Sequence, residues 1–286
     1  MPTVAIVTCA ELPDLDPDEA RIVAPLRDLG IAAVPAIWTD PSVAWDSFDL
    51  AVLRCPWDYH RDRAAFVDWA RTVPRLVNDA ATVEWNTDKR YLRELAAAGI
   101  TTVDTTWFEP GAEPVLPREG VWVLKPAVGA GSRDAGRYDL ASPAEHALAI
   151  EHVTRLLAED LVVMAQPYMF DVDKHGETAL IYIDGVYSHA ITKAAMLDGP
   201  HIPNLDLYKG ERITTAAPDE DQLAMAEAVL AAVPGDGAPL YARVDLIRDG
   251  DTLRLMELEL TEPSLFYGHA PDSVATMAAA IARHVG

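Results

Sequence analysis

The stretch Leu255-Met256-Glu257-Leu258-Glu259-Leu260-Thr261-Glu262-Pro263 alternates apolar and acidic side chains. This alternation predicts a β-strand whose two faces meet different surroundings. Glu257 and Glu259 then lie on one face, about 7 Å apart. Upstream, Arg243-Val244-Asp245-Leu246 predicts a second strand, and Asp249-Gly250-Asp251 predicts a hairpin turn that joins the two strands.

The predicted hairpin brings Asp245 beside Glu257 and Glu259. Three carboxylates on one sheet face repel each other unless a cation lies among them, and hard oxygen ligands suit Mg²⁺. Removing one of these charges is therefore expected to stabilise the metal-free protein. The alternative is a solvated strand face with ordinary acidic residues, and this segment alone does not separate the two interpretations.

The composition is that of a globular protein. The chain has 286 residues, 50% of them hydrophobic and 24% charged, which is enough for two or three modest domains. Its 23 basic and 45 acidic residues give a formal charge of −22, which disfavours nucleic acid and anionic membranes as partners. No apolar run reaches the roughly 18 residues of a membrane helix, and no signal peptide is recognised, so we expect a cytoplasmic protein. Cys9 and Cys55 follow apolar runs and are expected to be reduced core residues, not a disulfide or a metal pair.

The N-terminal part alternates strand and helix patterns. Strands are predicted at residues 4–8, 31–37, 50–53 and 75–77, and helices at residues 16–29 and 61–71. Alternating units of this length predict an open parallel sheet. In such sheets, ligands bind beyond the carboxyl ends of the strands.

Charged and aromatic residues follow the third predicted strand, namely Arg54, Trp57, Asp58 and Tyr59. Opposite charges a few residues apart suit a zwitterionic amino acid, with Arg54 on its carboxylate and Asp58 on its amine. Trp57 and Tyr59 would then form the walls of the pocket. The alternative, which these residues favour when taken alone, is a loop held by an internal Arg54–Asp58 pair and a packed tryptophan.

Lys89 lies near the start of a helix that is predicted to begin at Thr87 or Asp88. The helix dipole disfavours a lysine in the first turn. This position is more natural if the side chain reaches out to a phosphate group, so Lys89 is a candidate ligand of an anion.

Lys125 ends another predicted strand, at residues 121–125, and a loop of small residues with Gly131 and Ser132 follows at once. Small residues allow backbone N–H groups to close on phosphate oxygens. The loop alone is weak support because any tight hairpin would need similar residues. The strand, the lysine and the loop together favour a phosphate site.

A proline stands at the end of the strand predicted at residues 161–165, in Gln166-Pro167-Tyr168-Met169. Proline ends regular strand pairing and frees neighbouring backbone groups, which suit an adenine edge. Tyr168 and Met169 would add flat apolar contact. A kinked edge strand is an equally compatible interpretation.

A hairpin is predicted from strands at residues 177–183 and 186–191, with a two-residue turn between them. Lys193 follows the second strand and is a candidate third phosphate contact. Residues 196–211 lack a regular pattern and are expected to form a mobile loop. Helices are predicted at residues 144–158, 220–233 and 273–285.

The order of these features resembles the ATP-grasp superfamily, which includes D-alanine–D-alanine ligase, glutathione synthetase and the ribosomal-protein glutamate ligase. The resemblance covers nearly the whole chain. It implies a mixed α/β fold with an open parallel N-terminal domain over residues 1–84 and a small central lid subdomain over residues 85–165. A C-terminal, mostly antiparallel domain would span residues 166–286, with ATP held between the last two.

The resemblance also implies roles for the matching residues on the nucleotide side. Lys89 and Lys125 would hold the ATP phosphates, and the loop around Gly131 and Ser132 would close over them. The adenine slot would be lined by Gln166, Pro167, Tyr168 and Met169. The ribose would meet Glu177.

On the metal side, Asp245, Glu257 and Glu259 match the Mg²⁺ ligands of the superfamily. Glu259 stands where many relatives have asparagine, and this departure adds one negative charge to the site. Arg243 matches the arginine that steadies the acyl phosphate, and Lys193 takes a place often held by arginine.

Three stretches, at residues 54–60, 85–91 and 257–266, are similar to a narrower group that includes the O-ureido-serine cyclo-ligase of D-cycloserine biosynthesis. This implies an ATP-dependent carboxylate–nitrogen ligase that acts through an acyl phosphate on a small amino-acid-like substrate, as in antibiotic biosynthesis. The most specific expectation is closure of O-ureido-D-serine to D-cycloserine. Alternatives are an ATP-grasp ligase for another amino acid or dipeptide, a kinase-like phosphotransferase, and a nucleotide-binding protein without turnover. The number of metal ions and a homodimer stay open.

Overall fold

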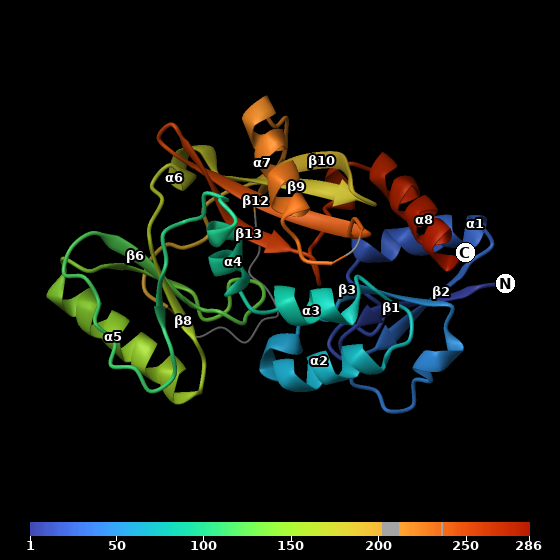
Figure 1. The fold of residues 1–286 in the computed structure, drawn as a ribbon, viewed down its shortest axis with the longest axis horizontal. Helices are drawn as coiled ribbons and strands as arrows, with labels where there is room; N and C mark the ends of the chain where they lie inside the picture. Colours follow the sequence, from blue (N-terminus) through green and yellow to red (C-terminus); the bar gives the residue numbers. More distant parts are fainter. Residues whose placement is uncertain (202–211, 236) are drawn as a thin grey trace.

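The computed structural model describes residues 1–201, 212–235 and 237–286. These residues form three β-sheets with helices packed against them (Figure 1). The sheet of the central part lies at one end of the molecule, and the N-terminal sheet lies at the other end, near both chain termini. The predicted mobile loop at residues 196–211 falls for the most part outside the described residues.

The N-terminal sheet is parallel, as predicted, with the strand order β2-β1-β3-β4. Its strands are β1 (Thr3–Thr8), β2 (Ala32–Ile37), β3 (Leu50–Cys55) and β4 (Leu76–Val77). Every residue of β3 is buried, which explains its continuous apolar pattern. The helix predicted over residues 16–29 is shorter and begins as the 3-10 turn η1 (Glu19–Ile22) before α1 (Val23–Asp28). Further along are η2 (Trp45–Ser47), η3 (Tyr59–Arg61) and α2 (Arg63–Thr72).

The central sheet is antiparallel, with the order β5-β8-β6-β7. It contains β5 (Thr106–Phe108), β6 (Val121–Pro126), β7 (Gly136–Asp139) and β8 (Val163–Pro167). Helix α5 (Pro143–Ala158) covers one of its faces (Figure 1) and is capped by the Ser142 side chain.

The C-terminal sheet has the order β11-β10-β9-β12-β13 and is antiparallel in all of its pairs. Its elements are β9 (Glu177–Ile183), β10 (Val186–Lys193), β11 (Ile213–Ala216), β12 (Tyr241–Asp249) and β13 (Thr252–Glu259). The predicted hairpin register is confirmed, because Asp245 pairs with Glu257 and Arg243 pairs with Glu259. The remaining elements are α6 (Val172–His175), α7 (Glu220–Ala231), η4 (Tyr267–His269) and α8 (Asp272–Val285).

The chain between the N-terminal and central sheets departs from prediction. A short helix, α3 (Ala80–Asn86), precedes α4 (Tyr91–Ala97), and Lys89 lies in the connection between the two. Lys89 is therefore not in a first helical turn, and the dipole reasoning for it was wrong. Helix α4 packs in one hydrophobic cluster with the C-terminal sheet. The division into domains at residues 84 and 165 stays a prediction.

The N-terminal and C-terminal sheets share one hydrophobic core, to which strands β1, β3 and β9 and helix α8 contribute. Helix α8 lies beside α1 (Figure 1). This shared core holds the two sheets in a defined relation, so segments that run between them can be positioned from both sides.

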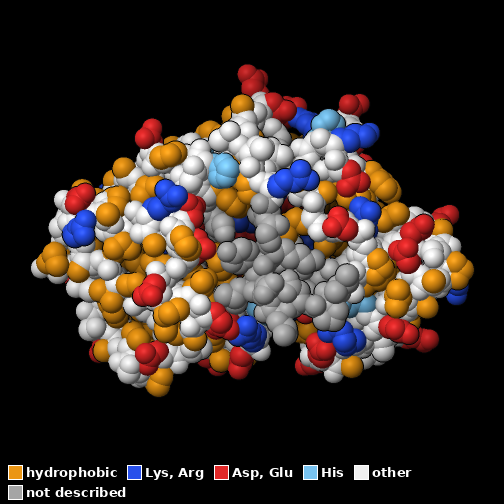
Figure 2. All heavy atoms as spheres, turned by 180° about the vertical axis from the view of Figure 1, so that it is seen from behind, with side chains coloured by type: hydrophobic (Ala, Val, Ile, Leu, Met, Phe, Trp, Pro, Cys, Tyr) orange, Lys and Arg blue, Asp and Glu red, His pale blue; other side chains and the backbone are white. Residues whose placement is uncertain are grey.

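The surface agrees with the acidic composition. On the face shown in Figure 2, Asp and Glu side chains are spread over the described residues and Lys and Arg are interspersed among them. Among the described helices, none combines the length and apolar character that crossing a bilayer requires.

Candidate active site

A cavity of about 500 Å³ is lined by strands of the central and C-terminal sheets and by segments that follow β1 and β3 of the N-terminal sheet. Most of the predicted site residues line it: Trp57, Lys89, Lys125, Gly131, Ser132, Gln166, Pro167, Tyr168, Met169, Glu177, Lys193, Arg243, Glu257 and Glu259. Asp245 lies behind this lining and has no exposed surface. Residues that are far apart in the sequence therefore meet in one place, which is the property expected of a site where ligands converge.

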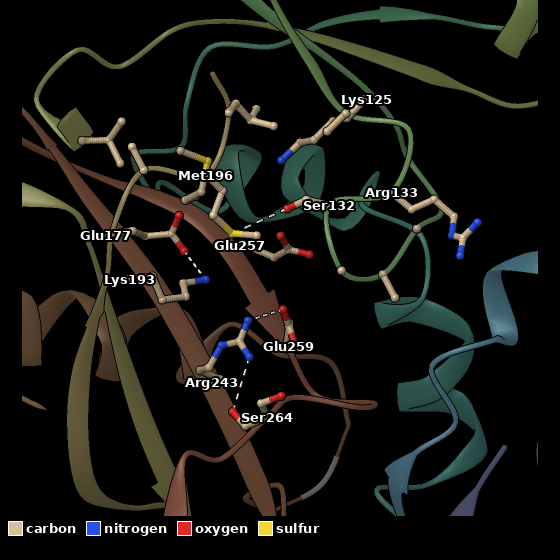
Figure 3. Close-up of a pocket in the computed structure, with 18 of the residues that line it drawn as sticks. Lys125, Ser132, Arg133, Glu177, Lys193, Met196, Arg243, Glu257, Glu259 and Ser264 are labelled. Carbon is tan, nitrogen blue, oxygen red and sulfur yellow. Dashed lines mark hydrogen bonds and ion pairs between the residues drawn. The ribbon is translucent and has the colours of Figure 1, made fainter. Parts of the chain in front are cut away.

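Acidic and basic side chains alternate in space across the floor of the cavity (Figure 3). Lys193 Nζ lies 2.5 Å from Glu177 Oε1 and 2.6 Å from Asp245 Oδ2. Arg243 Nε donates to Asp245 Oδ1 at 2.9 Å, and the same guanidinium pairs with Glu259. Strands β9, β10, β12 and β13 supply these groups from adjacent positions, so the cluster follows directly from the strand order.

Glu257 completes the cluster, with its Oε1 atom 3.0 Å from Lys89 Nζ. The carboxylate oxygens of Asp245, Glu257 and Glu259 are not all within 4.8 Å of one another. The protein's own cations thus stand where the predicted Mg²⁺ was expected to neutralise charge. The donors are of the hard-oxygen type that suits Mg²⁺, but side-chain movement is needed before one ion meets all three.

The pKa values in the cluster diverge because burial and pairing act differently on each acid. Burial raises the pKa of Glu259 to about 8 despite its contact with Arg243, and it raises the pKa of Glu177 and of Glu262 to about 7. Burial acts in the same direction on Asp245, but Arg243 and Lys193 outweigh it and hold its pKa below the usual range. Likewise Lys89 and Lys125 outweigh burial at Glu257 and lower its pKa.

These shifts predict a pH dependence of stability for the metal-free protein. A folded-state pKa of about 8 at Glu259, against an ordinary value of 4.5, means that the folded protein binds more protons than the unfolded chain above pH 4.5. Stability from this group is present at acid pH and is lost as the pH rises through about 8. In EDTA, the melting temperature of the wild type should fall between about pH 4.5 and 8, and Glu259→Gln should flatten that fall. If the melting temperatures of the two proteins fall in parallel as the pH rises, the raised pKa of Glu259 would be contradicted.

The phosphate side of the cavity is formed by Lys89, Lys125 and the loop after β6. Lys89 Nζ donates to Gly129 O at 2.7 Å, which ties it to that loop. Lys125 points from β6 into the cavity above Glu257 (Figure 3). Burial lowers the pKa of Lys125, and the nearby charge of Lys89 adds to this effect. Both lysines would gain from an anion placed between them.

Gly131 and Ser132 both have left-handed backbone conformations, with φ of 61° and 55°. In the same loop, Ser132 Oγ contacts Met196 Sδ at 3.9 Å across the cavity mouth. Arg133 points away from the cluster of acids (Figure 3). The loop therefore presents small side chains and backbone to the cavity, as a phosphate-covering loop requires.

The four residues of the predicted adenine slot also line the cavity. The ring of Tyr168 packs against the Arg137 guanidinium, 4.6 Å from its centroid, and its hydroxyl donates to Asp173. Met169 clusters with Val103 and Ile247. Tyr168 and Met169 thus bring an aromatic ring and an apolar side chain to the lining of the cavity, which suits a planar base.

Two of the four predicted substrate residues, Arg54 and Asp58, do not line the cavity and are held by contacts within the protein. Arg54 is fully buried, and its Nε donates to Glu19 Oε2 at 2.6 Å. Asp58 accepts a hydrogen bond of 2.6 Å from Trp38 Nε1. Of the four residues only Trp57 lines the cavity, and Tyr59 is almost fully buried. The internal-pair alternative fits these contacts, but with Glu19 as the partner of Arg54 in place of Asp58, so Arg54, Asp58 and Tyr59 are not carried forward as substrate ligands.

Several lining residues were not assigned a site role from the sequence, among them Glu262, Ser264 and Phe266 after β13 and Asp16 and Glu19 after β1. Glu262, Ser264 and Phe266 lie in the stretch 257–266, which is similar to the O-ureido-serine cyclo-ligase group. That similarity could have marked them as site residues. The acids after β1 follow the carboxyl end of a parallel strand, where ligands gather.

Within residues 1–201, 212–235 and 237–286, two other clusters have the composition of metal sites, but the contacts of their residues oppose metal binding. Asp134, His152 and His201 each bring one candidate ligand atom within 4.8 Å of the others, but Asp134 is paired with Arg155 at 2.6 Å and His152 Nδ1 lies 2.8 Å from the Tyr138 hydroxyl. In the second cluster, Cys9 lies near Glu11 and Asp58, which are engaged by Arg61 and Trp38. Cys9 and Cys55 are buried free thiols.

Comparison with known proteins adds the family. A profile described as "D-cycloserine synthetase DcsG, N-terminal domain" matches residues 4–78. The cycloserine biosynthesis protein DcsG of Streptomyces lavendulae is 39% identical over the full chain and 99% of its own length. The crystal structure of D-cycloserine synthetase DcsG superposes with a TM-score of 0.88 at 37% identity, covering 99% of this chain and 100% of that one.

A more distant structure shares the fold. D-alanine–D-alanine ligase from Bacillus anthracis, complexed with ATP, has a TM-score of 0.70 at 14% identity and covers 100% of this chain and 97% of that one. The RimK domain protein ATP-grasp from Sphaerobacter thermophilus has a TM-score of 0.66 at 16% identity and covers 99% of both chains, so the mixed architecture of one parallel and two antiparallel sheets is the ATP-grasp fold, as predicted. By its full-length identity, the chain belongs to the D-cycloserine synthetase DcsG family of the ATP-grasp superfamily and is an ATP-dependent ligase.

Proposed function

We propose that this ligase closes O-ureido-D-serine to D-cycloserine through an acyl phosphate, with release of ADP and phosphate. The full-length identity to DcsG supports the substrate class. The observation that carries the chemistry is the single cavity in which Lys125 and the small-residue loop face the acids of β12 and β13 beside Arg243. A free carboxylate is a poor acyl donor, and such a site is suited to phosphorylating it.

Asp245, Glu257 and Glu259 are the residues that would hold Mg²⁺. When bound with ATP, the ion would neutralise the charge of the transferring phosphoryl group. The remaining positive charge at the phosphoryl group would come from basic side chains of the protein. Lys89 and Lys125 would bind the phosphates, and Arg243 would steady the acyl phosphate from the side of β12.

The substrate's carboxylate oxygen attacks the γ-phosphorus of ATP, and ADP leaves. The nitrogen next to the ether oxygen of the same molecule then attacks the acyl carbon, phosphate leaves, and the nitrogen loses its proton. Because the nucleophile is tethered to the electrophile, proximity favours ring closure. Conversion of the ureido nitrogen to the ring N–H also removes the carbamoyl group, which consumes water and yields carbon dioxide and ammonia.

No protein nucleophile is required, and the loop around Ser132 would limit access of water to the acyl phosphate. The substrate-facing end of the cavity would be formed by Trp57, Glu262, Ser264 and Phe266, which line it. Its acidic character suits a substrate that carries an ammonium group.

The test is to incubate the purified protein with Mg²⁺, ATP and O-ureido-D-serine, and to measure ADP, phosphate and D-cycloserine by chromatography and mass spectrometry. We expect all three products to appear in equal amounts. A dipeptide or another amide from other amino acids would replace the proposal with a different ligase activity. Phosphorylated acceptor without free phosphate would indicate a phosphotransferase, and nucleotide binding without any product would indicate a binding protein.

A further inference from the structure

The chain that follows β13 has an irregular backbone that is bonded from two sides. We call residues 260–266 the strap. Each of its carbonyl oxygens from residue 260 to residue 265 lies within hydrogen-bond distance of a side-chain donor, in chain order Asn78, Tyr241, Trp57, Arg54, Arg243 and His189. Such complete side-chain satisfaction of consecutive carbonyls fixes the path of a segment that has no strand partner.

The donors come from both sheets that share the core. Asn78, Trp57 and Arg54 belong to the N-terminal part, and Tyr241, Arg243 and His189 belong to β12 and β10 of the C-terminal sheet. The strap is therefore hydrogen-bonded to side chains of both the N-terminal and the C-terminal parts of the molecule. Its position depends on both of them together.

Arg54 and Glu19 hold the strap at two points that flank Ser264. Arg54 donates through one terminal nitrogen to Pro263 O at 2.5 Å and through Nε to Glu19 Oε2 at 2.6 Å. The other oxygen of Glu19 accepts from Leu265 N at 3.2 Å. One buried ion pair thus fixes the backbone on either side of Ser264, which lines the cavity.

The strap also reaches the proposed reaction centre. Ser264 O accepts from Arg243 at 3.3 Å, and the Arg243 guanidinium lies 5.6 Å from the centroid of the Phe266 ring. Phe266 has a left-handed backbone, with φ of 51°, which a non-glycine residue keeps only where its surroundings dictate it. A shift of the strap would therefore move both the substrate end of the cavity and a contact of Arg243.

A contribution to stability does not by itself explain why the protein buries the Arg54–Glu19 ion pair. Burying two charges carries a large desolvation cost, and an apolar pair of similar size often stabilises a fold as well or better. We propose that Arg54 and Glu19 are a positioning pair, which sets the strap and its cavity face for the amino-acid substrate. This inference rests on the proposed function for its substrate and reaches residues that do not touch the reacting atoms.

The test compares Arg54→Lys with the wild type. Lysine keeps the charge beside Glu19, but a single ammonium group does not reproduce the two nitrogen positions that bond Glu19 and Pro263 together. We expect KM for the amino-acid substrate to rise about tenfold while KM for ATP changes by less than about twofold. The matched control is Arg71→Lys, because Arg71 is half exposed, lies in the same part of the chain and pairs with Asp68 and Glu84 away from the strap.

A second variant tests the proposal in case Arg54→Lys does not fold. The double variant Arg54→Gln with Glu19→Gln removes both charges together and leaves no uncompensated buried ion. It should raise KM for the amino acid in the same way. If both variants lower the melting temperature while both KM values and kcat stay within about twofold of the wild type, the pair serves only the fold and the proposal is overturned.

Hydrogen–deuterium exchange separates this proposal from the proposed function. In Arg54→Lys, the peptide covering residues 260–268 should exchange faster than in the wild type, and in Arg71→Lys it should not. If the wild type turns over no amino acid, the proposed function fails, and the positioning role is decided by this exchange alone. If the peptide covering residues 260–268 exchanges as slowly in Arg54→Lys as in the wild type, the positioning role is overturned.

Discussion

Replacing Lys125 with alanine is expected to weaken binding of Mg²⁺–ATP by about 1–3 kcal/mol, and to lower kcat/KM at least in proportion. Lys125 is the residue before the last in β6, close to the small-residue loop, and points into the cavity. Within the described parts of the chain, Lys89, Lys193 and Arg243 form ion pairs with the site's carboxylates, whereas Lys125 forms none. Its charge is thus held in the cavity at a cost of desolvation that an incoming phosphate would relieve.

The measurement is calorimetric titration of the protein with ADP or a non-hydrolysable ATP analogue in Mg²⁺. Lys174→Ala is the control, since Lys174 is an exposed lysine at the end of α6. The control should bind as the wild type does. An unchanged affinity in Lys125→Ala would remove the phosphate role from this residue and weaken the case for the whole loop.

The parts of the site that could be predicted from the sequence are those set by local pattern. The alternation in β13 and the tight turn before it determine which side chains share a face, so the pairing of Asp245 with Glu257 followed from spacing alone. The parallel N-terminal sheet was predictable for the same reason, because its buried strands are continuous apolar runs.

The parts that could not be predicted depend on partners far away in the sequence. Lys89 was placed in a first helical turn because Thr87 or Asp88 could cap that helix, yet its backbone N–H bonds to Ala127 O, just after β6. Arg54 was assigned to a substrate because it lies at the carboxyl end of a predicted parallel strand with the opposite charge of Asp58 nearby in sequence, whereas Glu19 is its partner in the fold. Spacing reveals the register of a hairpin, but it does not reveal which charge a buried side chain meets.

Replacing Glu257 with glutamine is expected to abolish ligase turnover, with a loss of about a hundredfold or more in kcat. The residue would lose its metal-ligand charge, while the amide keeps its size. The effect on stability is opposite to the one expected from the sequence. Three mutually repelling carboxylates would gain from losing a charge, but Lys89 lies 3.0 Å from Glu257 and the pKa of Glu257 is lowered in the fold.

A carboxylate with a lowered pKa contributes stability above its ordinary pKa of 4.5, and that contribution is lost as the pH falls through the lowered value. At neutral pH, Glu257→Gln should therefore lower the free energy of unfolding of the metal-free protein by about 1 kcal/mol. Glu151→Gln, at an exposed position on α5, is the control for both readouts. Because Lys89 is released from its pair, ADP binding without Mg²⁺ should be kept or strengthened, while the gain in affinity on adding Mg²⁺ should shrink. If the variant turns over normally at low Mg²⁺, the acids of β12 and β13 form only a charged strand face and the metal assignment is wrong.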